Sequence, residues 1–208
     1  MELIIISNPD YSEHEFENIN LMFEHGMECF HIRKPDYTEN QLSQVLLNIA
    51  SEFRSRIVLH DHYSLVYKYN LKGIHLTSKF KSRNPWSVVN EVISTAKNNN
   101  KTLSTTAHTT DELMKLYDPY DYVFLSPVFD SISKTFHKSA INLADVKIIL
   151  KKKPYEFKVI AQGGIDENNI AEVKKAGFDG VSILGALWKS SDLICKYESL
   201  KNKMNAGN

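Results

Sequence analysis

The sequence is poor in cysteine and has no excess of charge of either sign. Its 208 residues contain only two cysteines, Cys29 and Cys195, and neither has the spacing of a metal ligand. Cys29 lies in a strand-like apolar run and Cys195 on a helical pattern, which predicts two buried free thiols, with one disulfide as the alternative. Free thiols are typical of a reducing compartment, so the cysteines favour a cytoplasmic protein.

Further absences disfavour nucleic acid and membranes as partners. The chain has 25 basic and 25 acidic side chains and a formal net charge of zero, so we expect no charged surface for nucleic acid or an acidic membrane. No apolar run approaches the about 20 residues that a transmembrane helix needs. The N-terminal residues 1–7 are too short and too acidic for a signal peptide. We therefore expect a cytoplasmic protein that binds a small molecule.

Short apolar runs alternate with helical patterns along the whole chain. The runs that predict strands are residues 3–7, 28–33, 56–60, 73–76, 102–107, 122–126, 158–161 and 180–184. The patterns that predict helices are residues 13–25, 39–54, 64–69, 85–97, 110–116, 143–150, 167–175 and a last helix that begins near residue 192. Residues 127–141 are expected to form a loop, and residues 202–208 a frayed tail.

Eight strands that are each followed by a helix imply parallel pairing through right-handed crossovers. This pattern predicts an α/β fold, a single (β/α)8 TIM barrel, with residues 1–208 as one domain. A doubly wound open sheet is the structural alternative. Active sites of the barrel lie on the loops that follow the strands, so polar residues at strand ends carry the functional information.

Six of the eight histidines fall at or near the predicted strand ends, beside other polar residues. These residues are His31 with Arg33, then His60, Asp61 and His62, then His75, then Thr106 and His108, and finally Lys134 and His137 after the sixth strand. His108 is the best candidate for proton transfer, because an imidazole titrates near neutrality. Arg33 and Lys134 are fixed positive charges suited to a carboxylate or a phosphate, and an ion pair of Arg33 with Asp61 is the structural alternative.

Glycines follow the last two predicted strands. Gly163 and Gly164 precede a helix, where backbone N–H groups can approach an anion and the helix N-terminus adds partial positive charge. Gly185 repeats this arrangement after the eighth strand, and the loops after strands seven and eight are the habitual phosphate site of the barrel. The sequence therefore predicts phosphate binding at Gly163, Gly164, Leu184 and Gly185, with two ordinary turns as the alternative.

A zinc site made of His60, Asp61, His62 and His75 is the metal hypothesis that these residues suggest. Neighbouring residues on a strand point to opposite faces, so His60 and Asp61 cannot easily both enter the barrel. The sequence therefore predicts no resident metal.

At these residues the sequence resembles the thiamine phosphate synthase family, including its TenI branch of thiazole tautomerases. The resemblance covers nearly the whole chain and is carried by short runs in a fixed order. The runs are His31-Ile32-Arg33, Leu59-His60-Asp61, Gly73-Ile74-His75-Leu76, Thr106-Ala107-His108 with Glu112, residues 122–129 with Lys134, residues 161–165 and residues 177–182. The resemblance implies a (β/α)8 barrel, often a homodimer, that binds a thiazole phosphate.

The synthase of this family joins a thiazole phosphate to hydroxymethylpyrimidine pyrophosphate and uses Mg²⁺ held by two aspartates. The resemblance implies Asp61 as the first ligand, but Phe80 stands at the second position. The synthase triplet Arg-Glu-Lys after strand two becomes Arg33-Lys34-Pro35, so the lysine that faces pyrophosphate is missing. Mg²⁺ prefers oxygen ligands, which Phe80 cannot supply, and pyrophosphate would lack its usual charge compensation.

The tautomerase branch needs no metal and resembles this chain more closely at His31-Ile32-Arg33 and at His108. On that hypothesis His108 is the catalytic acid and base, the glycine loops hold the phosphate, and the substrate-binding residues are His31, Arg33, His60, Thr106 and Lys134. The serine of the last phosphate loop is replaced by Gly185, so only backbone contacts remain there. We favour a cofactor-free thiazole tautomerase, with the Mg²⁺-dependent synthase and a non-catalytic barrel that binds thiazole or thiamine phosphate as alternatives.

Overall fold

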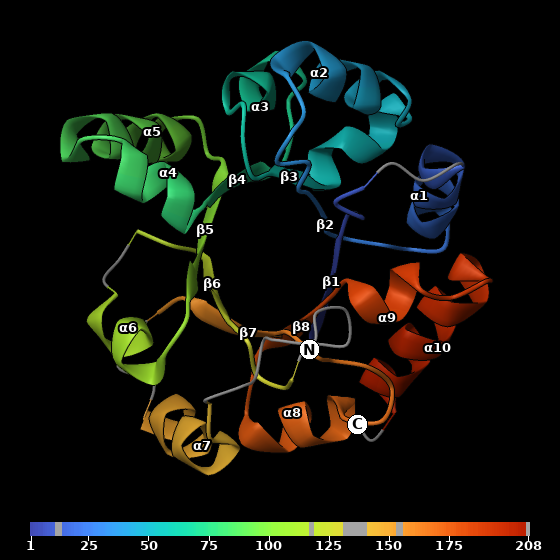
Figure 1. Ribbon diagram of the computed structural model, residues 1–208, viewed down its shortest axis with the longest axis vertical. Coiled ribbons are helices and arrows are strands. Elements are labelled where there is room, and N and C mark those ends of the chain that lie inside the picture. The colour runs from blue at the N-terminus through green and yellow to red at the C-terminus, as the bar shows by residue number, and fades with distance from the viewer. Residues whose placement is uncertain (11–13, 117–118, 131–140, 153–155, 207–208) are drawn as a thin grey trace. The chain divides into compact units, whose positions relative to one another are not determined.

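The computed structural model describes residues 1–10, 14–116, 119–130, 141–152 and 156–206 (Figure 1). Eight strands follow one another in chain order, β1 to β8, in a closed barrel. The pairs β1–β8, β2–β3, β3–β4, β4–β5, β6–β7 and β7–β8 are all parallel. This order confirms the (β/α)8 TIM barrel. The alternative, a doubly wound open sheet, is wrong because such a sheet reverses its strand order and keeps two edges.

Residue contacts divide the chain into two compact units. The first-half unit is Ile6–Thr105, and the second-half unit joins Met1–Ile5 to Thr106–Asn208. The single domain over residues 1–208 stays a prediction.

The strands are three to six residues long, and most of their residues are buried. Their bounds are β1 (Glu2–Ile6), β2 (Phe30–Ile32), β3 (Ile57–Leu59), β4 (Gly73–Leu76), β5 (Thr102–Ala107), β6 (Tyr122–Leu125), β7 (Lys158–Gln162) and β8 (Gly180–Ile183). Strands β2, β3, β4, β6 and β8 contain buried residues only. Burial on both faces is typical of parallel strands covered by helices.

Helices follow the strands within each unit (Figure 1). In the first-half unit they are α1 (Glu15–Glu24), α2 (Glu39–Leu47), the 3-10 helix η1 (Ser51–Arg56), α3 (Ser64–Lys68), α4 (Ser78–Arg83) and α5 (Trp86–Asn98). In the second-half unit they are α6 (Thr110–Lys115), α7 (Leu143–Lys152), α8 (Ile170–Ala176), α9 (Gly185–Trp188) and α10 (Leu193–Asn205). Several ends are set locally: Thr38, Thr109 and Asp192 accept backbone N–H groups at helix starts, and Gly177 ends α8 in the left-handed conformation.

The helix predicted over residues 39–54 is divided in two. Helix α2 ends at Leu47, and the chain then forms η1. The Arg54 Nε donates to the carbonyls of Leu46 and Ile49, which satisfies two acceptors that an unbroken helix would have used itself. A side chain that returns to its own helix end is not visible in hydrophobic periodicity, so the sequence pattern missed the break.

Two short helices were missed, and the frayed tail was wrong in part. Helices α4 and α9 have six and four residues, too few to display a helical apolar period. The tail was expected to fray from residue 202, but α10 continues to Asn205 because Met204 is buried. The predicted loop over residues 127–141 lies largely outside the described residues, which end at 130 and resume at 141.

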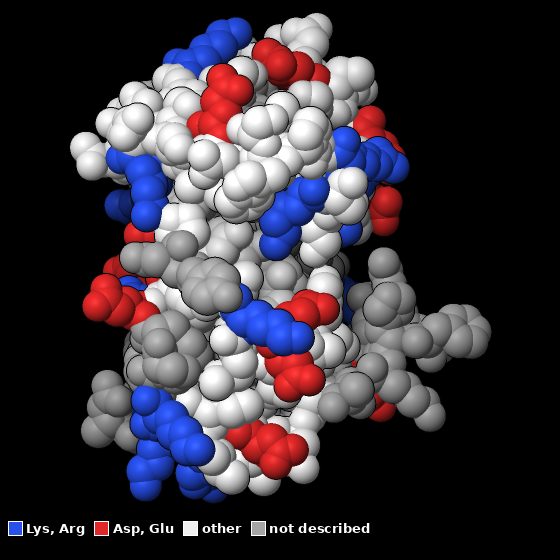
Figure 2. All heavy atoms as spheres, turned by 90° about the vertical axis from the view of Figure 1, so that its left-hand side faces the viewer, with Lys and Arg blue, Asp and Glu red and all other residues white. Residues whose placement is uncertain are grey.

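The surface carries mixed charge. Figure 2 shows basic and acidic side chains interspersed over the face that it displays, as the balanced composition leads one to expect. Both cysteines are free, but Cys195 is exposed, so the prediction of two buried thiols holds only for Cys29. Within the described part of the chain, no helix is long and apolar enough to cross a membrane.

Candidate active site

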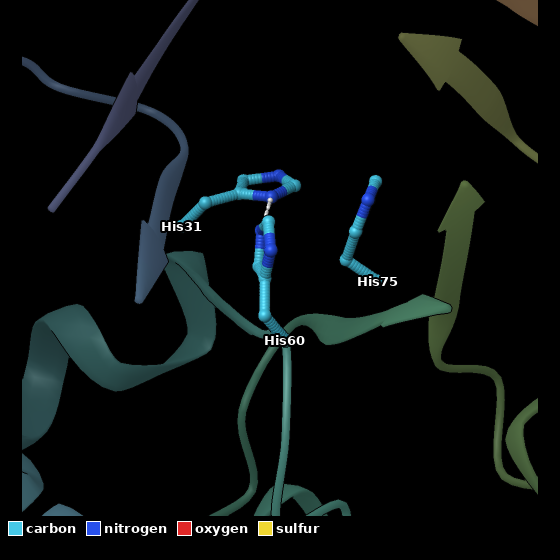
Figure 3. Close-up of side chains that lie close together, drawn as sticks. All are labelled: His31, His60 and His75. Atoms are coloured by element: carbon cyan, nitrogen blue, oxygen red, sulfur yellow. Dashed lines mark hydrogen bonds between the residues drawn. The ribbon is translucent and has the colours of Figure 1, made fainter. Parts of the chain in front are cut away.

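Three histidines converge in the first-half unit, and we call them the histidine cluster (Figure 3). They are His31 in β2, His60 directly after β3 and His75 in β4, with exposed fractions of 0%, 7% and 2%. The register explains the convergence, because His31 pairs with Val58 and His60 follows two residues later on the same face of β3. The structure thus brings together two predicted substrate-binding residues and one further histidine.

Hydrogen bonds fix the orientation of these rings. The His31 Nδ1 lies 2.9 Å from the His60 Nε2, and the rings of His60 and His75 stack with centroids 4.2 Å apart. The His75 Nδ1 lies 2.9 Å from the Ser104 Oγ, which in turn contacts the Ile74 carbonyl at 3.4 Å. Because a carbonyl only accepts, Ser104 donates to Ile74 and accepts from His75, which leaves the lone pair of His75 on Nε2.

The imidazoles of the histidine cluster are neutral. Burial lowers the pKa of His31 and His60 well below the usual value, and the neighbouring imidazoles lower each further. Burial also lowers the pKa of His75 to about 3, with the positive charges of Lys81 and Arg33 as additional causes. A neutral imidazole has one ring nitrogen with a free lone pair, which can accept a hydrogen bond. The adjacent cations, Lys81 and Arg33, would attract an anionic group near the cluster.

Positive side chains lie beside this cluster. Arg33 follows β2 and is exposed, and the ion pair with Asp61 that the sequence left open is not formed among the described residues. Lys81 on α4 donates from Nζ to the Thr105 Oγ1 over 2.8 Å. Sequence reasoning missed Lys81, Ser104 and Thr105. Recognising α4 as a segment that follows a strand end would have identified Lys81.

The structure explains why Lys34 cannot replace the missing lysine of the synthase. Its Nζ lies 2.7 Å from the Glu15 Oε2 and 2.9 Å from the Asp10 carbonyl, and both charged side chains are 1% exposed. A lysine that is buried against a carboxylate inside the unit is unavailable to a ligand. The Lys34 side chain therefore compensates the buried Glu15 carboxylate and does not reach a ligand.

The described residues do not fit a magnesium site held by two aspartates. Asp61 is exposed, and its Oδ1 accepts the backbone N–H of His62. At the second position, the Phe80 ring packs edge-on against Tyr63 with centroids 5.0 Å apart. An aromatic ring supplies no oxygen ligand, so only one carboxylate remains for a hard cation.

His108 lies directly after β5 in the second-half unit. Its backbone N–H donates to the Glu112 Oε2 over 2.7 Å, and its Nδ1 lies 3.1 Å from the Ser126 carbonyl. The carbonyl can only accept, so Nδ1 carries the proton and Nε2 carries the lone pair. The ring is exposed, and the role of His108 in proton transfer stays a prediction.

The glycine loop after β7 lies at the same end of the sheet as His108. Gly163 and Gly164 have φ values of 95° and 65°. Val128 and Phe129, which follow β6, donate to the carbonyls of Gln162 and Gly163 over 2.8 and 3.1 Å. The hydrogen bond of His108 to Ser126 joins the same stretch, so a continuous set of contacts connects the imidazole with the glycines.

A side-chain contact and positive φ angles define the backbone of this glycine loop. The Gly164 carbonyl accepts from the Asn169 Nδ2 over 2.8 Å, which fixes the turn. Among the residues that the structure describes, the amide groups of Gly163 and Gly164 donate to no acceptor. Unpaired N–H groups in a turn with positive φ are the donors that an anion requires.

The remaining predicted residues have mixed placements. Gly185 begins α9, and the Leu184 carbonyl accepts from the amides of Leu187 and Trp188. Thr106 is half-buried in β5, and Lys134 lies outside the described residues. The Ser182 hydroxyl in β8 is a feature that the sequence did not single out: it is buried and has no hydrogen-bond partner within the part of the chain that the structure describes. An unpaired buried hydroxyl near the end of β8 is a further candidate donor to a ligand.

Comparison with known proteins gives consistent descriptions. A family model described as thiamine monophosphate synthase (TMP-TENI) matches residues 3–187. The thiamine-phosphate synthase of Oceanobacillus iheyensis is 27% identical over 155 residues, which cover 74% of this chain and 71% of that protein. The thiamine-phosphate synthase of Listeria monocytogenes is 26% identical over 184 residues, which cover 85% of this chain and 83% of that protein.

Solved structures agree with this picture. The thiamine phosphate pyrophosphorylase from Bacteroides thetaiotaomicron is 27% identical, covers 100% of both chains and has a TM-score of 0.79. The thiamine phosphate pyrophosphorylase from Pyrococcus furiosus is 19% identical, covers 98% of this chain and 95% of its own, and has a TM-score of 0.78. The second likeness shows the fold alone.

Proposed function

This chain belongs to the thiamine monophosphate synthase (TMP-TENI) family, and we propose that it acts as a thiamine-phosphate synthase. The reaction joins a thiazole phosphate to hydroxymethylpyrimidine pyrophosphate with loss of pyrophosphate. The observation that carries the proposal is the family match over residues 3–187, a span that includes both the histidine cluster and the glycine loop. The relatives are named for this reaction, so the comparisons favour the synthase over the tautomerase that the sequence favoured.

The glycine loop is our candidate for the phosphate of the thiazole substrate. Gly163 and Gly164 offer two backbone N–H groups in a turn that Asn169 fixes. Backbone donors that are fixed before binding cost no reorganisation when the anion arrives. Gly185 and the Ser182 hydroxyl are further candidate contacts, because both lie at the end of the adjacent strand β8.

Arg33 and Lys81 are our candidates for the charge of the pyrophosphate group. Both lie near enough to His75 for their charges to lower its pKa. Guanidinium and ammonium groups meet phosphate oxygens through charge-assisted hydrogen bonds. Phe80 leaves Asp61 without a second carboxylate, so the residues present do not fit the Mg²⁺ site of the synthase.

Replacement of Lys81 by methionine tests this assignment. We expect inorganic pyrophosphate to bind about 10- to 100-fold more weakly, since a hydrogen bond to a charged group contributes about 1.5–3 kcal/mol. Isothermal titration calorimetry measures the affinity. Lys79→Met is the matched control, because Lys79 lies on the same helix and is exposed. Equal losses in the two variants would refute the role of Lys81.

Thiazole tautomerisation is the second candidate, and Phe80 is the observation that favours it. The lost carboxylate and the buried Lys34 remove synthase features, whereas a tautomerase needs neither. His108 would then transfer the proton through Nε2 while its Nδ1 donates to Ser126. An imidazole held in one tautomer suits this exchange.

One set of assays separates the candidates. The purified protein is given thiazole phosphate with pyrimidine pyrophosphate, with and without Mg²⁺, and separately the non-aromatic carboxythiazole phosphate. Formation of thiamine phosphate supports the proposal, and tautomerisation without it supports the second candidate. His108→Gln should lower tautomerisation roughly 100-fold and change the joining rate far less. Binding of thiazole phosphate with turnover of neither substrate would contradict both and identify a non-catalytic binding protein.

A further inference from the structure

We propose that the histidine cluster binds a first-row transition-metal ion, zinc foremost, through one nitrogen each of His31, His60 and His75. The synthase and the tautomerase do not require such a site, and the sequence predicted no resident metal. The zinc hypothesis considered from the sequence named a different set of residues. The proposal concerns the first-half unit alone.

The geometry carries the proposal. The three imidazoles each offer one ligand atom, and these atoms lie within 4.8 Å of one another (Figure 3). Two nitrogens on a tetrahedral zinc ion stand roughly 3.3 Å apart, given Zn–N bonds of about 2.0–2.1 Å. The His31 Nδ1 and the His60 Nε2, at 2.9 Å, are slightly closer than that. Small rotations about the broad imidazole torsions convert the hydrogen-bonded cluster into three ligands.

The residues around the cluster orient these ligands. Ser104 holds the His75 Nδ1–H, so the Nε2 lone pair of that ring faces a fixed direction. A metal-bound histidine usually donates its other N–H to such a partner, which sets its tautomer. In the pair of His31 and His60, the ring that donates must move its proton to its other nitrogen when the metal binds.

Two of the four residues in the zinc hypothesis from the sequence, Asp61 and His62, do not belong to the histidine cluster. Asp61 is exposed and accepts the backbone N–H of His62. The His62 Nε2 donates to the Tyr37 carbonyl over 2.8 Å, so this ring is engaged elsewhere. Only His60 and His75 of the original set belong to the cluster, and His31 from the preceding strand completes it. The spacing of these residues in the sequence does not show that His31 in β2 lies beside His60 and His75. Their proximity follows from the register of β2, β3 and β4 in the barrel.

The ligand set indicates the class of ion. Imidazole suits zinc, copper, iron and nickel, whereas magnesium and calcium prefer oxygen ligands. Within the described ranges, the group is made of the three histidines without a carboxylate. Three protein ligands leave one position open, as in catalytic zinc sites. Arg33 and Lys81 place positive charge beside the cluster, so the open position favours an anion.

A cobalt titration tests the site in the full chain. After treatment with EDTA and dialysis, we expect one equivalent of Co²⁺ to produce the visible bands of four-coordinate cobalt, and Zn²⁺ to remove them. His60→Gln should weaken binding by more than about 100-fold, since even partners outside the ligand shell contribute 10- to 100-fold. His62→Gln is the matched control, because its ring is two residues away and bonds to Tyr37. Its affinity should equal that of the wild type.

A measurement on the wild type keeps the test valid if His60→Gln fails to fold. Two-dimensional NMR of the eight histidine rings should show three of them shifting on addition of Zn²⁺. Co²⁺ bands that persist in folded His60→Gln would overturn the proposal. So would shifts confined to other imidazoles, or the absence of stoichiometric binding.

Discussion

Replacing Lys34 by methionine should lower the free energy of unfolding by about 3–5 kcal/mol, measured by urea denaturation at neutral pH. The Lys34 ammonium lies 2.7 Å from the Glu15 carboxylate, and both side chains are 1% exposed. Methionine keeps most of the volume but leaves the carboxylate buried without its counter-charge. Among the described residues, the Glu15 Oε1 already lacks a hydrogen-bond partner, so none of them compensates for the lost lysine.

The loss should depend on pH. Burial raises the pKa of Glu15 above 4.5, and Lys34 opposes that shift. Removing Lys34 raises the pKa further, so between 4.5 and the raised value the folded state binds more protons than the unfolded state. Stability then falls as pH rises through this interval and recovers as pH is lowered toward 4.5. Unfolding curves between pH 4.5 and 8 measure this dependence.

The double variant Lys34→Met, Glu15→Leu is the control. Removing both charges of a buried pair together is often neutral or stabilising. We expect it to recover most of the stability that Lys34→Met loses and to abolish the pH dependence. If the double variant is as unstable as the single one, lost packing rather than the unpaired carboxylate causes the effect.

Replacing Gly164 by alanine should cost about 3–5 kcal/mol in unfolding free energy and abolish most phosphate affinity. An added Cβ would overlap the Asp130 carbonyl oxygen and stand 2.7 Å from the Phe129 Cβ. The φ of 65° adds backbone strain for any residue with a side chain. Moving the turn away from residues 129–130 would also displace the amides that we assign to the phosphate. Thermal unfolding with and without inorganic phosphate measures both effects.

Gly177→Ala is the control that separates backbone strain at positive φ from steric overlap of the added Cβ. Gly177 also has positive φ, at 91°, but among the described residues its added Cβ would meet only the Leu150 Cβ, at 3.9 Å. We expect this control to lose about 1–2 kcal/mol and to keep its response to phosphate. A loss at Gly164 no larger than that at Gly177 would show that the close approach of residues 129–130 is not maintained in solution.

The spacing of hydrophobic residues along the chain was sufficient to predict the barrel. Strands β4 and β5 have the predicted bounds. The failures have local causes. The return of Arg54 to its own helix end divided a predicted helix, and α4 was too short for its period to be recognised. The spacing of hydrophobic residues shows which face of a helix is buried. Neither the Arg54 contact nor the shortness of α4 changes which face is buried.

The sequence was sufficient to predict those features of the candidate site that depend only on which residues lie at strand ends. His31, His60 and His75 each lie at or near a strand end, but their meeting depends on register, which the sequence does not encode locally. The fate of Lys34 also depended on a partner nineteen residues away in α1. The preference for a tautomerase followed from single residues such as Phe80, whereas the relatives' names reflect similarity along most of the chain.

The hydrogen bonds that follow β6 have a mechanical consequence. Val128 and Phe129 tie their segment to the turn at Gly163, and Ser126, just before them, anchors the ring of His108. In the site that we propose, a phosphate bound at the turn would therefore also restrain Ser126, the residue that holds the His108 ring. Binding of the phosphate and the orientation of the imidazole would then be coupled, and both would be released together.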